Sequence, residues 1–311
     1  MLVTRQIILL AEESTYNDGA VGDPTTDAIL VNSVTLSNAS ARMIERPVIK
    51  QTLDPLQQVF GGTMMSVQFT VEVKGSGEAG TAPEIGVALK ACGFMETVSA
   101  GTSVVYSSTS EDITSCSIEA YQDGVLRKLS GCRGTVSFTM NAGELITADF
   151  TFTGHYDSHS DTALPNATYQ STVPSALINL QGLRIGTYTP KIGSLTIDTA
   201  NEIVTPADIT DEMGFGEVRI VSRDINGTMD PEMVLLAEQD FLQDWFDGDT
   251  KVFTTGEIGA EEGNIISVSI PQLVYRDVAQ GERDNLLTDS LTFGCHESLD
   301  GTTPALTITF T

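Results

Sequence analysis

Strict alternation between apolar and polar residues constrains the fold of this chain more than any other feature. It runs through residues 66–74, 136–140, 146–152 and 306–310. In the first stretch the apolar positions are Val67, Phe69, Val71 and Val73. A period of two is typical of β-strands with one buried and one solvated face. We therefore expect a mainly β protein whose strands carry Thr, Ser and Asp on their wet side.

Two short helices are expected among these strands. In residues 81–93, Pro83 begins and Gly93 ends a helix whose apolar stripe is Ile85, Ala88, Leu89 and Cys92. In residues 230–248, Asp230 is placed to cap a helix, with Pro231 in the first position and Gly248 at the end. Its predicted stripe is Met233, Leu236, Ala237, Phe241 and Trp245.

The order of strand, helix, hairpin and strand occurs twice, which predicts a structural duplication into two β-sandwich or barrel domains with one packed helix each. Asp123-Gly124 marks a tight hairpin in the first half. We expect an N-terminal arm packing on neighbouring molecules in 1–60 and a first domain in 61–155. An interdomain connection follows in 156–190, and a second domain in 191–311.

The charge limits the partners that the chain can bind. The sequence holds 42 acidic and 16 basic residues, a formal net charge of −26. Such a surface repels the phosphates of nucleic acid and of anionic lipid. No apolar run is long enough to span a bilayer, and the first residues lack the features of a signal peptide. We expect no membrane association.

Gly75, Gly77 and Gly80 have the spacing of a dinucleotide-binding fingerprint. That site requires a strand buried on both faces before the glycines, whereas the strand here alternates. Glu78 and Glu84 would also repel a phosphate at the start of the following helix. A nucleotide-dependent enzyme is therefore the weakest interpretation.

Other candidate chemistry is sparse. His155, Asp157 and His159 could converge on a metal, but a polar loop is the favoured interpretation. The cysteines lack metal-binding spacing and are expected to be reduced core residues: Cys92, Cys116, Cys132 and Cys295. We predict no catalytic group, no metal and no cofactor.

Seven segments carry a family resemblance: "RQIILLAEEST" (5–15), "RMIERPVIKQTLDPLQQVFGG" (42–62), and those at 65–110, 120–157, 243–253, 266–295 and 305–311. They resemble the tail tube, or major tail, proteins of long-tailed bacteriophages. The resemblance covers nearly the whole chain.

The resemblance implies a non-enzymatic structural protein of the virion tail, assembled in the host cytoplasm. Subunits of this family form rings whose inner strands join into one β-barrel, and the rings stack into a tube through which DNA leaves the capsid. Two such halves in one chain imply trimeric rings with pseudo-sixfold symmetry, with hexameric rings as the alternative. Further partners are the tape measure protein, the tail terminator and the distal tail or baseplate proteins. DNA would pass without tight binding.

Two sets of residues follow as candidates. The polar strand faces predict an acidic lumen lined by Gln68, Thr70, Glu72, Thr147, Asp149, Thr151, Ser267, Ser269 and Asp289. The glycine-rich loop is predicted to be a flexible joint between subunits, formed by Gly75, Ser76, Gly77, Glu78 and Gly80. The alternative function is an acidic β-sandwich module that binds a sugar or a metal ion.

Overall fold

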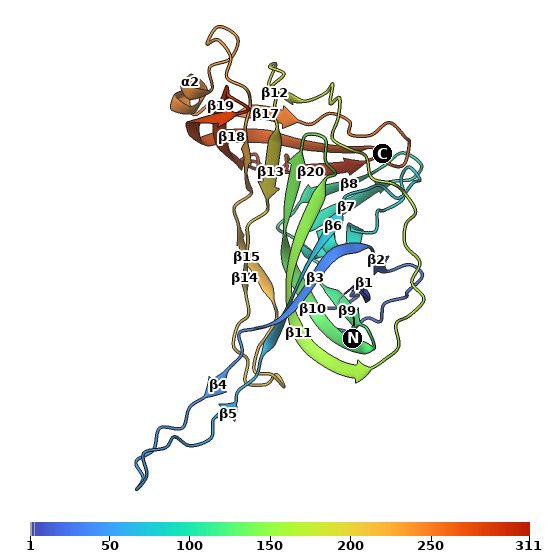
Figure 1. Cartoon of the computed structure of the whole chain (residues 1–311), viewed down its shortest axis with the longest axis vertical. Helices are drawn as coiled ribbons and strands as arrows, with labels where there is room; N and C mark the ends of the chain where they lie inside the picture. The colour runs from blue at the N-terminus through green and yellow to red at the C-terminus, as the bar shows by residue number, and fades with distance from the viewer. Residues whose placement is uncertain (1, 3) are drawn as a thin grey trace.

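The computed structural model describes residue 2 and residues 4–311, and it is built mainly of β-strands (Figure 1). The first half contains β1 (Gln6–Glu12), β2 (Ala28–Ile29), β3 (Val31–Ala39), β4 (Met43–Ile44), β5 (Val59–Phe60), β6 (Met64–Glu72), α1 (Gly86–Ala91), β7 (Phe94–Ser99), β8 (Ser103–Ser108), β9 (Cys116–Gln122), β10 (Val125–Asn141) and β11 (Thr147–Asp161). The second half contains β12 (Arg184–Ile185), β13 (Ser194–Asp198), β14 (Asn201–Val204), β15 (Arg219–Arg223), β16 (Asn226–Met229), α2 (Phe241–Asp247), β17 (Lys251–Thr254), β18 (Ile266–Arg283), β19 (Leu286–Cys295) and β20 (Thr307–Phe310).

Eight strands pair one after another in an antiparallel series that crosses both halves of the chain. Their order is β3-β6-β11-β10-β13-β16-β19-β18. We call this the central series. The same order of strands recurs in each half of the chain. In the first half, the single strands β3 and β6 are followed by the long hairpin β10–β11. In the second half, β13 and β16 are followed by the long hairpin β18–β19.

The alternation predicted from sequence is confirmed in these strands. Val67, Phe69 and Val71 of β6 are buried, and the residues between them are not. The rings of Phe69, Phe150 and Phe152 stack with centroids 5.4–5.9 Å apart, the separation at which aromatic pairs attract each other. One face of the central series is therefore an apolar core.

Further strands and α1 form the remainder of the fold. The first half of β10 pairs with β9, which continues through β1 to β2. The first half of β18 pairs with β17 and with β20, which continues through β8 to β7. The helix α1 contacts β1, β9 and β10, and its predicted stripe is buried as expected.

The two halves are more closely joined than the prediction of two domains implied. One sixteen-stranded sheet contains strands of both halves. The largest buried cluster likewise combines residues of the first half, such as Phe150, with residues of the second, such as Phe293. Within the described residues of this single chain the sheet does not close into a barrel.

The projecting arm is shorter than the 1–60 segment expected from sequence. Residues 6–12 form β1 inside the sheet, where Ile8, Leu9 and Leu10 are almost fully buried. Only residues 40–62, which include β4 and β5, extend away from the body as a long hairpin (Figure 1). We call residues 40–62 the arm.

The second helix starts ten residues later than its sequence pattern predicted. Asp230 does not cap a helix, because its Oδ1 accepts hydrogen bonds from the backbone amides of Gly193 and Ser194. The backbone amide of Met233 donates instead to a carbonyl of the neighbouring strand β19. The helix α2 is capped by Asp240 and ends at Gly248, as expected, with φ +67°. Of the predicted stripe only Phe241 is buried.

The connection between the halves also begins later than expected. The strand β11 continues through residues 156–161, and the chain then runs along the outside of the molecule to β12 (Figure 1).

Candidate assembly surfaces

The second face of the central series is polar from strand to strand. Two rows of directly paired residues cross it, and every member except one glycine has a polar side chain. The first row is Ser33, Thr70, Asp149, Ser137, Asp198, Asn226 and Gly294. The second row is Glu72, Thr147, Thr139, Thr196, Thr228, Thr292 and Asp277. These two polar rows hold four carboxylates and no basic side chain, and the guanidinium of Arg276 lies over Gly294, where it is paired with Asp224. The surface is therefore acidic, with one cation that is already neutralised by an ion pair.

Hydrogen bonds across the strands hold these side chains in place. The hydroxyl of Ser33 donates to Thr70, and the hydroxyl of Thr70 donates to the carboxylate of Asp149. The hydroxyls of Thr196 and Thr228 lie 2.8 Å apart. Such cross-strand polar pairs stabilise a sheet surface that remains wet.

Six of the nine residues predicted for the lumen lie together on this face. Gln68, Thr70 and Glu72 pair directly with Thr151, Asp149 and Thr147 in adjacent strands. The signal that located them was the alternation itself.

The other three predicted lumen residues lie elsewhere. Ser267 and Ser269 belong to the first half of β18, where they pair with Thr309 and Thr307 of β20 outside the central series. Asp289 is on β19, two residues before the buried Leu291, and residues two apart in a strand point to the same face. The side chain of Asp289 therefore lies on the opposite face from Thr292. Burial and the nearby Asp240 carboxylate raise the pKa of Asp289.

The central series ends in two strands with an unoccupied edge. Among the described residues, β3 pairs only with β6. The last part of β18, residues 277–283, pairs only with β19. An unpaired strand edge offers a row of backbone donors and acceptors to another chain. The equivalent strand of the first half of the chain is β10, and its last residues, 137–141, already pair with β13.

The register fixes which features lie at the two ends of the central series. The arm connects the end of β3 to the start of β6, so it leaves from the end that we call lower. The β14–β15 hairpin connects β13 to β16 at the same end. The tip of the β18–β19 hairpin, at 284–285, lies at the opposite, upper end, where α2 also lies (Figure 1).

The base of the arm is fixed to the second half of the chain. The guanidinium of Arg42 lies 3.7 Å from the centre of the Phe215 ring, and its Nη1 donates to the carbonyl of Gly214 at 3.1 Å. Cation–π contact and a charged hydrogen bond thus act on one side chain. They hold the direction in which the arm leaves the body.

The glycine-rich loop, predicted as a joint between subunits, is packed over part of its length against residues 263–264 of its own chain. Gly75 is buried, and its amide donates to Asn264 Oδ1 at 2.9 Å. The amide of Gly77 donates to the carbonyl of Gly263 at 2.9 Å. The neighbouring Lys74 is buried against Glu84, with 3.3 Å between the charged atoms. Only Gly77 and Glu78 are exposed.

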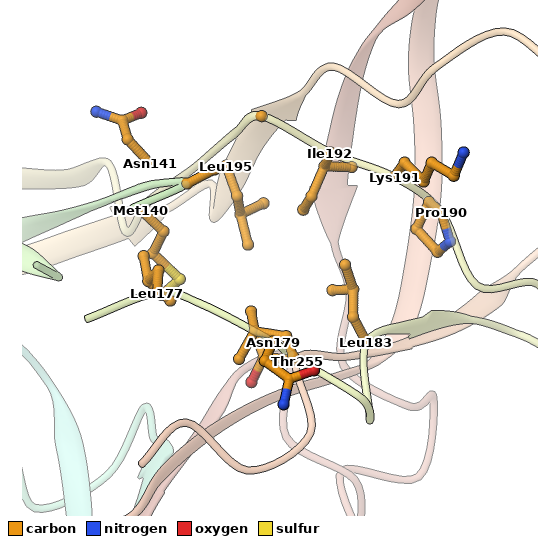
Figure 2. A pocket seen from close by; sticks show the side chains of 13 residues that line it. Met140, Asn141, Leu177, Asn179, Leu183, Pro190, Lys191, Ile192, Leu195 and Thr255 are labelled. Carbon is orange, nitrogen blue, oxygen red and sulfur yellow. The ribbon is translucent and has the colours of Figure 1, made fainter. Parts of the chain in front are cut away.

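A small cavity of about 220 Å³ lies where the connection between the halves crosses β10 and β13. Figure 2 shows Leu183, Ile192 and Leu195 pointing into it, while the amine of Lys191 points away. No carboxylate or imidazole lines it. The cavity is therefore a small packing defect between the connection and the two strands.

The histidine cluster predicted as a possible metal site is dispersed along β11. His155 is buried beside the Tyr16 ring, and His159 contacts Tyr156. No group of metal-ligating side chains is found among residue 2 and residues 4–311. In the same residues no helix is long and apolar enough to cross a membrane.

The chain thus presents a wet acidic face, two unpaired sheet edges and a projecting hairpin, and an unpaired edge is a template for pairing with another chain. The sequence model of a family described as phage tail tube protein matches residues 4–295, nearly the whole chain. The chain therefore belongs to the phage tail tube protein family. No curated protein matches it significantly.

Proposed function

We propose that three copies of this chain join edge to edge into a ring, and that such rings stack into the tube of a phage tail. The observation that carries the proposal is the central series, because it combines a continuous polar face with two unpaired edges. The edge of β18 at residues 277–283 would pair with β3 of the next copy. This contact would repeat between copies the pairing that β10 makes with β13 inside each chain.

The number of copies follows from the size of the bore. Strands lie about 4.8 Å apart and tilt by about 40° in barrels. Three copies would contribute 24 strands, giving a barrel about 48 Å across between backbones, wide enough for side chains and a DNA duplex. Six copies would give a barrel about 96 Å across between backbones on the same reasoning. Three copies with a repeated strand order would have pseudo-sixfold symmetry, so the repeat supports two tube domains per chain.

The polar rows would face the lumen in this ring. Their carboxylates, including Glu72, Asp149 and Asp277, would repel the phosphates of DNA. Repulsion prevents the adhesion that basic side chains cause through counterion release. DNA would then move through the tube without binding, and the protein would act without catalysis or a cofactor.

The remaining surfaces would serve contacts along the tail. The arm would contact a neighbouring copy, and the ends of the tube would contact the tape measure, terminator and distal tail or baseplate proteins. Assembly in the host cytoplasm agrees with four buried cysteines that are all in the thiol form.

Imaging of the purified protein tests the proposal. On concentration it should form rings or tubes whose inner barrel is uniformly about 48 Å across between backbones, and the smallest ring should weigh about 100 kDa, three times the 33.2 kDa chain. A protein that stays monomeric at every salt and protein concentration would contradict self-assembly. Tubes whose inner barrel is about 96 Å across between backbones would contradict the trimeric ring but agree with a tube.

A further inference from the structure

We propose that the tip of the arm of one copy docks on an apolar patch at the upper end of a copy in the next ring. The patch consists of Met233, Leu235, Leu236, Leu286 and Leu287, which we call the upper patch. This inference rests on the proposed tube function and assigns the surface that receives the arm.

The upper patch is apolar yet exposed. Leu235 and Leu236 are about three-quarters exposed, and Leu286 and Leu287 are about half exposed. Met233, Leu235, Leu286 and Leu287 line one shallow groove together with Glu232 and Glu238. Contiguous exposed apolar side chains mark interaction surfaces in soluble proteins.

The late start of α2 explains why these side chains are available. The amides of Glu232 and Met233 are bonded to Lys191 and Leu287, so this segment continues the sheet and cannot turn into a helix. Leu235 and Leu236 follow it in an irregular turn and face outward. A continuous helix would have placed Leu236 on the stripe with Phe241.

The tip of the arm carries the matching groups. Ile49 and Leu53 are fully exposed, and Val48 is half exposed. Arg46 precedes Val48, and Lys50 lies between Ile49 and Leu53. Neither cation forms an ion pair within the described part of the chain. This apolar hairpin therefore presents two cations without an ion pair in that part of the chain, and the carboxylates of Glu45 and Asp54 flank them at the two ends of the same segment.

The charge of the surroundings matches these cations. Residues 230–249 hold seven acidic side chains and no basic one. Four of these acids form ion pairs with Lys191, Lys251 or Arg283, which leaves Glu238, Asp240 and Asp247 without an ion pair in the described ranges, residue 2 and residues 4–311. Glu238 is exposed at the edge of the groove and has no ion-pair partner among the residues described. Opposite charges at a rim favour the correct partner and orientation. An apolar centre with a charged rim is the usual anatomy of such an interface.

The positions of the two surfaces make the contact intermolecular. The arm leaves the lower end of the central series, and the upper patch lies at the other end of the long axis of the molecule (Figure 1). One chain cannot bring them together. Different surfaces that join head to tail without closing produce an open stack, which is the geometry of a tube.

Cysteine cross-linking tests the contact directly, because the four natural cysteines are buried and unavailable. The variant with Ile49→Cys and Leu287→Cys should give a ladder of covalent multimers after mild oxidation of its tubes. The control pairs Ile49→Cys with Leu299→Cys, since Leu299 is more exposed than Leu287, and so at least as available for cross-linking, but lies outside the patch. A ladder from the first variant alone supports the proposal. Tubes that give no ladder, or a ladder only from the control, overturn the docking and leave the tube function intact.

Charge reversal provides an independent measurement. Lys50→Glu should raise the protein concentration needed for stacking at least tenfold, and adding Glu238→Lys should restore most of the loss. Glu297→Lys, on an exposed acid elsewhere, should not restore it. Equal stacking by Lys50→Glu and wild type would overturn the role of the cations. If the wild-type protein forms neither rings nor tubes, the proposed function itself fails.

Discussion

Replacing Gly75 by alanine tests whether the glycine-rich loop acts inside the molecule or between molecules. A Cβ at this position would lie 2.1 Å from the carbonyl oxygen of Gly263 and 2.8 Å from the Cα of Asn264. Both are backbone atoms, so no side-chain rotation relieves the clash. The two segments must separate by about 1 Å to reach ordinary contact, and the hydrogen bonds of Gly75 and Gly77 across the gap weaken as they do so.

The expected loss of stability follows from these contacts. Overpacking of this kind costs about 1–3 kcal/mol, and one weakened hydrogen bond adds about 1 kcal/mol. A total of about 2–4 kcal/mol should lower the Tm by about 5–10 °C. Calorimetry at a protein concentration below that of ring formation measures this effect on the single chain.

Gly216→Ala is the matched control. Its Cβ would find its nearest neighbour at 3.5 Å, an ordinary contact, so its Tm should stay within about 3 °C of the wild-type value. If Gly75→Ala melts like the wild type but forms no tubes, the reasoning is refuted and the loop acts between subunits.

Three further predictions concern the lumen, the arm and the core. Glu72→Lys combined with Asp277→Lys should still give tubes, but these should retain duplex DNA at low salt and release it at high salt; passage identical to that of wild-type tubes would argue against a lumen location. Arg42→Ala should speed amide exchange at the base of the arm and weaken stacking at least tenfold while the Tm of the body changes little, because the contact with Phe215 is lost; Arg46→Ala, at the tip, should leave exchange at the base unchanged. The four cysteines should resist thiol reagents until the chain unfolds, since burial raises their pKa values, that of Cys295 to about 12; rapid labelling of native protein would show that the core opens.

Local patterns predicted the parts of the fold that depend on neighbours in sequence. The alternation placed Phe69 and Phe150 in the core and Thr70 and Asp149 on the wet face. Asp123-Gly124 formed its tight turn, with φ of 43° and 106°. In each case the turn chemistry or the period of two agreed with the tertiary environment.

The errors arose where distant backbone groups competed with a local signal. Asp230 has the right position for a helix cap, but the amides of Gly193 and Ser194, more than thirty residues away, occupy its carboxylate. Gly75 and Gly77 suggested flexibility, whereas the close approach of residues 263–264 is what requires their missing side chains. Asp289 was predicted on the polar face, but near the tip of its hairpin it points to the same face as the buried Leu291. No local pattern in the sequence encodes such long-range contacts.

The long strands β10 and β18 belong to two pairings at once, and this affects how the molecule carries a load. Each begins beside the outer strands and ends in the central series, over 17 and 18 residues. A pull along such a strand loads its ladder hydrogen bonds in shear, so many of them must break together. A force on the central series is therefore transmitted along continuous backbone to the outer strands. Bending of the central series is therefore resisted by the outer strands, because the same two strands belong to both.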